Sequence, residues 1–143
     1  MPDIFSDFPI RASQDRVYQA VSTTAGLDSW WTKKAAGTPG VGAPFALGFG
    51  PGYDWQATVT KCTPAAEFEL EIVRADPDWL GTRVGFHLDG AGDVTHVRFH
   101  HTGWPTANEH WRVSCYCWPI YLRLLRRHLE YGEFVAYENR LEV

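Results

Sequence analysis

The sequence predicts an α+β fold in which a curved antiparallel sheet of about six strands wraps around one long C-terminal helix. Three observations support this prediction. An amphipathic helical stretch lies in the last third of the chain, residues 41 to 101 show the two-residue periodicity of strands, and only two short helical segments precede them. A helix with one apolar face must cover another apolar surface, and the sheet provides it. This arrangement is a helix-grip.

The long helix is predicted between Ala107 and Gly132. Its apolar residues recur at alternating spacings of four and three, which places them on one face; they are Trp111, Cys115, Trp118, Leu122, Leu125 and Leu129. Gly132 readily adopts the left-handed conformation that ends a helix. Pro119 cannot donate a backbone hydrogen bond, so we expect a helix start or a kink there, with a short helical segment over 107–115 separated from a main helix that ends at Tyr131.

The other elements follow from local patterns. Phe8 and Ile10 alternate with polar residues and predict a first short strand, after which Ser13 is the expected cap of a helix. A second short helix restarts at Thr23 and runs to Trp31. Five further strands are predicted, near residues 45–49, 53–59, 68–72, 80–88 and 97–101. In the third of these, Glu67, Glu69 and Glu71 are expected on a solvated sheet face.

The length of 143 residues suits one domain, which we place at residues 1–132, followed by a tail at 133–143. The apolar residues of the tail are too irregularly spaced for a helical stripe, so it is expected to pack on the domain or on a partner.

The charge and the cysteines limit the function classes. A net charge of −4 disfavours nucleic acid and anionic membrane surfaces as partners. No apolar run reaches the length of a membrane span or a secretory signal, and the three cysteines are too few for a disulfide framework. We therefore expect a cytoplasmic protein with no membrane and no nucleic acid partner.

Four runs of sequence resemble a known family. They are FPIRASQDRVYQAVSTTAGLDSWW at residues 8–31, GTRVGFHL at 81–88, VRFHHTGW at 97–104 and CYCWPIYLRLLRRHLEYG at 115–132. Together they resemble the START-like, or SRPBCC, superfamily, and within it the branch named for the C-terminal domain of the activator of the ninety-kilodalton heat-shock protein's ATPase. The resemblance implies a helix-grip fold with a hydrophobic ligand cavity between the sheet and the long helix. Its members include ligand carriers, polyketide aromatases and cyclases, and co-chaperone domains.

Aromatic side chains make up 15% of the residues and are large enough either to line such a cavity or to fill it. The predicted ligand-lining residues are Trp30, Trp31, Tyr53, Trp55, Trp79, Phe86, Phe99, His101, Trp104, Trp118, Tyr121 and Leu122. His101 shares strand parity with Val97 and Phe99, so it faces the interior and is the best candidate for a catalytic acid or base. The alternative is a structural histidine that anchors the turn into Trp104.

No metal site or cofactor is predicted. If Phe86 pairs with Val97 in the last hairpin, His87 lies opposite His96, but a stable zinc site needs three or four ligands. The chain also lacks a phosphate-binding glycine loop and the common hydrolase motifs.

The leading functional hypothesis is therefore a protein that binds a small hydrophobic molecule, aromatic or lipid-like, without an assigned reaction. The first alternative is an enzyme of the polyketide cyclase, aromatase or hydrolase type that uses the same cavity. The second is a co-chaperone-like protein-interaction module that acts through an exposed surface, although nothing in the sequence itself supports a chaperone as the partner. Independently of these alternatives, a homodimer is allowed.

Overall fold

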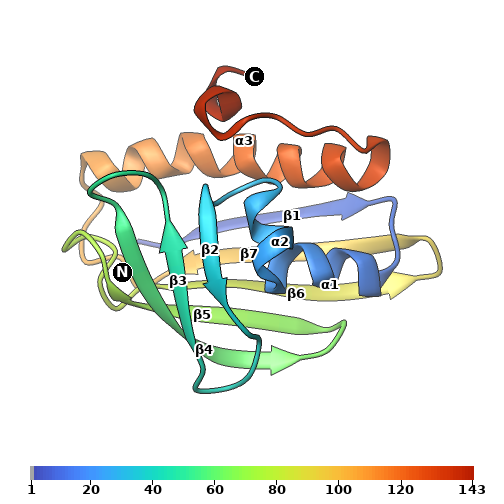
Figure 1. Ribbon diagram of the computed structural model, residues 1–143, viewed down its shortest axis with the longest axis horizontal. Coiled ribbons are helices and arrows are strands. Elements are labelled where there is room, and N and C mark those ends of the chain that lie inside the picture. The colour runs from blue at the N-terminus through green and yellow to red at the C-terminus, as the bar shows by residue number, and fades with distance from the viewer. Residues whose placement is uncertain (1) are drawn as a thin grey trace.

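The computed structural model describes residues 2–143, and its strands form one open antiparallel sheet that curves around a long helix (Figure 1). The strand order is β1-β7-β6-β5-β4-β3-β2. The strands are β1 (Ile4–Ile10), β2 (Lys34–Gly37), β3 (Pro44–Gly48), β4 (Asp54–Thr63), β5 (Glu67–Arg74), β6 (Arg83–Ala91) and β7 (Val94–Thr102). The helices are α1 (Gln14–Ser22), α2 (Thr24–Asp28), α3 (Glu109–Tyr131) and the short 3-10 helix η1 (Tyr137–Glu142). The predicted α+β helix-grip fold is confirmed.

The sheet has seven strands, one more than predicted. The additional strand is β2, which has the sequence KAAG and pairs with β3 at the edge of the sheet. Four residues without a β-branched or aromatic side chain carry little strand signal. This strand forms because β3 offers it a partner.

All α-helices lie on one face of the sheet. Val17 of α1, Leu27 of α2 and Leu125 of α3 are buried in the same core as the inward strand residues Val84 and Val97. Ser13 caps α1 by accepting a hydrogen bond from the backbone of residue 16, as predicted. The core therefore occupies the space between the helices and the concave face.

Helix α3 is continuous from Glu109 to Tyr131, so the predicted break at Pro119 is wrong. Asn108 caps its first turn by accepting a hydrogen bond from Trp111 N, and Gly132 ends it in the left-handed conformation, as predicted. Proline removes one hydrogen bond from the helix, but buried residues on both sides of it pack on the core. Tertiary packing therefore outweighs the local loss.

The hairpin of β6 and β7 differs in register from the prediction. Phe86 pairs with Phe99, and His87 lies opposite Arg98, so the expected pairing of His87 with His96 is wrong. Ala91 pairs with Val94 across a tight turn, whose Gly92 has a φ of 65°. This tight turn shifts the register by two residues relative to the prediction.

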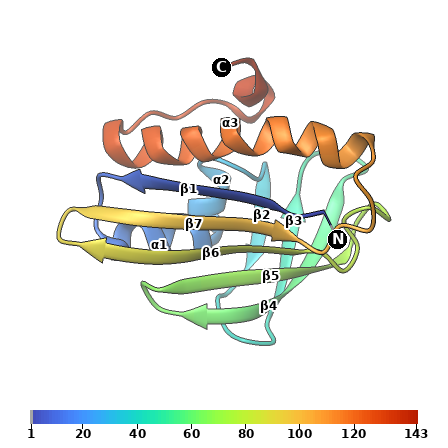
Figure 2. The ribbon, with the colours of Figure 1, turned by 180° about the vertical axis from the view of Figure 1, so that it is seen from behind.

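The tail runs back along α3, and Figures 1 and 2 show η1 on the side of α3 that faces away from most of the sheet. Arg140 of η1 is buried, with an exposed fraction of 1%. The tail thus packs on the body of the protein through a buried charged side chain.

Candidate functional site

Five aromatic side chains form a closed circuit between α3 and the concave face of the sheet. We call Trp31, Phe49, Trp55, Trp79 and Trp118 the aromatic cluster. Successive ring centroids lie 5.4, 5.4, 4.8 and 6.3 Å apart, and Trp118 returns to Trp31 at 5.2 Å. These distances are in the range of favourable aromatic pairs. Five separate segments of the chain therefore meet at one point.

The cluster has a buried side and an outer side. Trp31, Trp79 and Trp118 are buried, whereas Phe49 and Trp55 are half-buried. Beyond Trp55, the ring of Tyr53 is half exposed, and its centroid lies 6.3 Å from that of Trp55. The cluster thus extends from the core to solvent near the turn between β3 and β4.

The structure joins the predicted site residues other than Leu122 into one network. Trp30 stacks on Trp31 and contacts Phe86, which leads through Phe99 to Trp118. Tyr121 contacts Trp118 with ring centroids 6.3 Å apart, while Trp104 lies 4.6 Å from His101 and 5.9 Å from Trp79. Leu122 is buried but borders a groove between α3 and β1, beside Phe8 and Arg123.

His101 is fully buried at the inner side of the cluster, and both of its ring nitrogens are occupied. Trp118 Nε1 donates to Nδ1 at 3.0 Å, and Nε2 lies 2.9 Å from Thr82 Oγ1. An indole N–H is only a donor, so Nδ1 is unprotonated and the proton of the neutral ring is on Nε2. Nε2 then donates to Thr82 Oγ1, which donates to the carbonyl of Trp79 at 2.6 Å. The contacts therefore fix the tautomer of His101.

Burial, with smaller contributions in the same direction from the nearby His100 and His110, lowers the pKa of His101 to about 3. The ring is therefore neutral at physiological pH. A neutral imidazole with both nitrogens engaged has no group left for a ligand unless a neighbour moves.

A second histidine holds the outer edge of the same network. Trp79 Nε1 donates to His110 Nε2 at 3.1 Å, so Nδ1 of His110 carries the ring proton and donates to Asp78 at 3.2 Å. Asp78 also accepts a bond from Asn108, the residue that caps α3. The loop that carries Trp79 is thereby attached to the start of α3.

The outer face of the sheet carries a separate polar cluster, and the expectation that Glu69 is solvated is wrong. Its exposed fraction is 4%. The carboxylate accepts bonds from His100 Nε2 at 2.7 Å and Thr60 Oγ1 at 2.8 Å. Burial raises the pKa of Glu69, but these bonds and the charges of His100 and Lys61 outweigh it and lower the pKa to about 2.

Gly85 makes the contact between Glu69 and His100 possible. These three residues lie side by side on β5, β6 and β7. A Cβ atom at Gly85 would lie 2.4 Å from Cε1 of His100. The imidazole therefore crosses the middle strand only because that strand has no side chain there.

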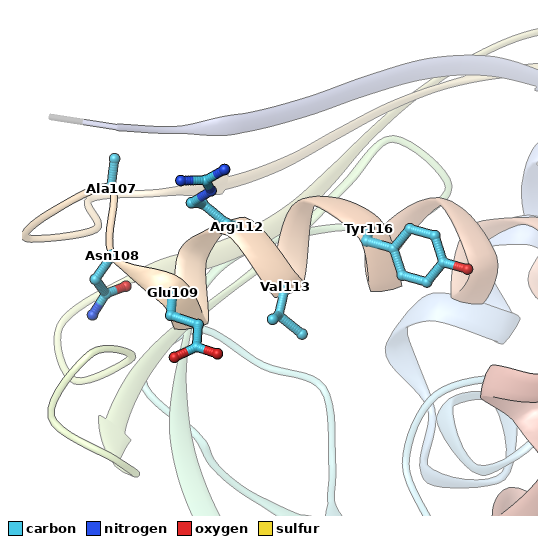
Figure 3. Close-up of a pocket in the computed structure, with 6 residues that line it drawn as sticks. All are labelled: Ala107, Asn108, Glu109, Arg112, Val113 and Tyr116. Atoms are coloured by element: carbon cyan, nitrogen blue, oxygen red, sulfur yellow. The ribbon is translucent and has the colours of Figure 1, made fainter.

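A hollow of about 500 Å³ lies along the first turns of α3, and Figure 3 shows the side chains that line it. No member of the aromatic cluster is among them. Its lining residues all come from one stretch of chain, 107–116. A single stretch has no opposite wall, so this is an open depression. The predicted ligand-lining residues do not border it.

Neither a metal site nor a membrane span is found in the part of the chain that the structure describes. Residues 2–143 bring no three histidine, cysteine or acidic side chains into a group that suits a metal ion. Within the same range, no helix has both the length and the apolar character needed to cross a bilayer.

Three participating residues were missed by the sequence analysis. Phe49 lies in a Gly/Pro-rich turn, so its inward direction could not be read from strand parity. Thr82 is polar and distant in sequence from His101, and His110 is equally distant from Trp79. Only the register of β6 and β7 and the position of the loop around Trp79 bring them to the site.

Comparisons with known proteins agree with the fold. The family model for Activator of Hsp90 ATPase homolog 1-like protein matches residues 11–130. No curated protein matches the chain. The solution structure of the Aha1 dimer from Colwellia psychrerythraea has 30% sequence identity and a TM-score of 0.83, with 93% of this chain and 99% of that chain covered.

Two further solved structures have the same fold. A Bacillus halodurans protein, BH1534, has 25% identity and a TM-score of 0.73, and the match covers 91% of this chain and 98% of that one. The Mesorhizobium loti protein MLL2253 has 19% identity and a TM-score of 0.79, with coverages of 93% and 100%. On the extent of the family match and the shared START-like helix-grip fold, the chain belongs to the Activator of Hsp90 ATPase homolog 1-like family.

Proposed function

We propose that this protein binds a small, largely apolar molecule, aromatic or lipid-like, at the aromatic cluster. The observation that carries the proposal is the closed circuit of five rings, with centroids 4.8 to 6.3 Å apart, which reaches from the core to solvent. A solid core does not need its largest flat side chains in one place. A site for a flat apolar ligand does, because ring faces give large contact area at low entropic cost.

The rings fill the space between α3 and the sheet, so a ligand enters by displacing the outer ones. Phe49 and Trp55 are half-buried and lie next to the turn between β3 and β4. Their movement exchanges ring-to-ring contacts for ring-to-ligand contacts. The buried side, formed by Trp79 and Trp118, remains in place as the inner wall.

Tyrosine hydroxyls give the ligand its orientation. Tyr121 is half-buried beside Trp118, and burial together with the nearby Tyr137 raises its pKa to about 12. It is therefore a neutral hydroxyl, able to donate or accept a hydrogen bond. Tyr53 offers a second hydroxyl at the outer side of the cluster.

The contacts of His101 give less support to the enzymatic alternative. A general acid or base needs a proton-exchanging nitrogen within reach of the substrate. In His101 one nitrogen accepts from Trp118 and the other donates to Thr82. The same contacts suit a structural role that sets the positions of Trp118 and of the loop that carries Trp79.

Native mass spectrometry of freshly purified protein tests the binding proposal. We expect a discrete excess mass that is lost on denaturation. Titration with the uncharged fluorophore N-phenyl-1-naphthylamine should then shift the indole N–H resonances of Trp31, Trp55, Trp79 and Trp118. The control variant Tyr116→Ser removes an exposed ring from the hollow on α3 and should leave this affinity unchanged. Loss of binding in Tyr116→Ser would place the ligand in that hollow and contradict the proposal.

A second candidate function is homodimer formation. The supporting observation is the Colwellia psychrerythraea structure, which has 30% identity and is described as a dimer. The same native mass spectra test it directly, because a dimer has twice the chain mass. A monomer at micromolar concentration would remove this candidate.

A further inference from the structure

We propose that the C-terminal tail, residues 133–143, is a strap that controls entry to the aromatic cluster. The inference rests on the proposed binding function and adds a gate to it. The strap attaches to the segments that carry Trp31 and Phe49, two members of the cluster. Its release would allow these segments to move.

The main attachment is the buried side chain of Arg140. Its guanidinium donates to the carbonyl of Asp28 at 2.7 Å and to that of Thr32 at 3.1 Å. A third bond, to the carbonyl of Val135 at 3.0 Å, fixes the side chain within the strap itself. Thr32 directly follows Trp31, so Arg140 holds the segment that leads out of α2 and into the cluster.

A second attachment holds the turn between β3 and β4. Tyr137 Oη donates to the carbonyl of Phe49 at 3.0 Å. This turn also contains Gly50 and Gly52, with φ values of 109° and 84°, and neither would bring a Cβ atom within 4 Å of another group. The turn is therefore loosely packed, and the hydroxyl of Tyr137 ties it to the rest of the protein.

The attachments are of a kind that can be broken and remade. Arg140 binds neutral carbonyl oxygens, and no carboxylate of the described residues lies within ion-pair distance of it. When the strap opens, water replaces these bonds, so the equilibrium cost is far smaller than for separating a buried ion pair. The exposed pair of Lys33 and Glu138, at 3.4 Å, adds little.

The linker is short and is anchored at its start. Arg127 binds Glu133 through two bonds, of 2.7 and 3.0 Å, directly after the end of α3. This pair fixes where the strap leaves the helix. Opening therefore rotates the segment 134–143 about Glu133 and frees the segments at Thr32 and Phe49 to move, while the helix stays in place.

The test compares the unmodified protein with two strap variants and one control. Arg140→Met keeps the length of the side chain but removes all three hydrogen bonds, and Tyr137→Phe removes only the bond to Phe49. Lys33→Gln removes the exposed ion pair of the same strap and is the matched control. Stopped-flow mixing with N-phenyl-1-naphthylamine gives the association rate, and deuterium exchange gives the protection of residues 45–55 and 133–143.

We expect Arg140→Met to raise the association rate about tenfold or more, with loss of protection in both segments. Tyr137→Phe should raise the rate about two- to fivefold, and Lys33→Gln should change it less than twofold. Lost protection of 133–143 with an unchanged association rate would overturn the strap alone. Absence of fluorophore binding in every protein would instead overturn the proposed function. If Arg140→Met does not fold, Tyr137→Phe and Lys33→Gln still decide between these outcomes.

Discussion

Two adjacent histidines on β7 show how differently the two faces of this sheet are built. His101 points into the core, where it is neutral and bonded to Thr82 and Trp118. His100 points to the outer face, where it donates to the buried carboxylate of Glu69. The inner face thus uses imidazole as an uncharged connector between aromatic side chains. The outer face uses it to stabilise a negative charge.

Burial alone therefore does not decide the charge state of a polar group in this sheet. Glu69 and His101 both have low exposure, at 4% and 0%, and in both the pKa is lowered. The consequences are opposite, because a lowered pKa keeps a carboxyl charged and keeps an imidazole neutral. The available partners set the outcome: donors surround Glu69, whereas apolar rings surround His101.

The largest effect should come from removing the inner histidine. We expect His101→Ala to lower the free energy of unfolding by about 3 to 5 kcal/mol, because it leaves a cavity, an unpaired N–H on Trp118 and the loss of one of the two bonds of Thr82. Urea denaturation measures it. The control His96→Ala removes a half-exposed histidine of the same strand and should change stability by less than about 0.5 kcal/mol. Equal effects of the two would mean that the inner contacts add nothing.

The outer face should be less sensitive. Glu69→Gln preserves the shape of the side chain but removes the charge from its bonds with His100 and Thr60. We therefore expect the free energy of unfolding to fall by about 2 kcal/mol. The more exposed Glu71, which bonds to Arg83, is the control, and Glu71→Gln should cost about 0.5 kcal/mol. A loss above that of His101→Ala would reverse the comparison of the two faces.

Gly85→Ala tests the same contact without changing either partner. The added methyl group would lie 2.4 Å from the His100 ring, so the ring must leave Glu69. We expect the free energy of unfolding to fall by about 1 to 2 kcal/mol, measured by thermal unfolding. The NMR chemical shifts of the His100 ring should change as well. Gly40→Ala, at a glycine with no group nearer than 4.0 Å, is the control. Normal His100 shifts in Gly85→Ala would contradict the proposed role of the glycine.

The smallest effect is a difference in pH dependence. The unfolded chain binds a proton at His101 near pH 6.5, whereas the folded protein binds it only near pH 3, so acidification between these values favours unfolding. For Glu69 the folded pKa is also the lower one, but its contribution is lost only as the pH falls from about 4.5 toward 2.

Between pH 6 and 5 only the first of these two groups titrates. Stability of the parent protein should therefore fall about 1 kcal/mol per pH unit more steeply than that of His101→Gln. Urea titrations at several pH values measure both slopes, and the other histidines contribute equally to each. Parallel curves would show that His101 is not held neutral.

The contrast between the faces also marks what the sequence could predict. Strand parity placed His101, Phe99 and Phe86 correctly on the inner face, because alternation is a local property. Parity also placed Glu69 on the outer face but could not reveal its burial. That burial depends on the register of three strands and on the absence of a side chain at Gly85.

The loops were the second part of the structure that could not be predicted from the sequence. The direction of Phe49 and the position of His110 depend on segments without periodicity, so they became visible only when α3, the β3–β4 turn and the loop around Trp79 were placed together. Pro119 shows the opposite error. There a strong local signal predicted a break, and packing of the helix on both sides overrode it.

The pairing of β1 with β7 has a consequence for how the chain folds during synthesis. Ile4 pairs with His101, so the first strand of the sheet must wait for the last one before it can pair. Arg140 joins Asp28 across 112 residues, which delays completion of the first helices further. Most of the molecule must leave the ribosome before its first thirty or so residues find their partners. We therefore expect this chain to fold at the slower rate typical of non-local topologies.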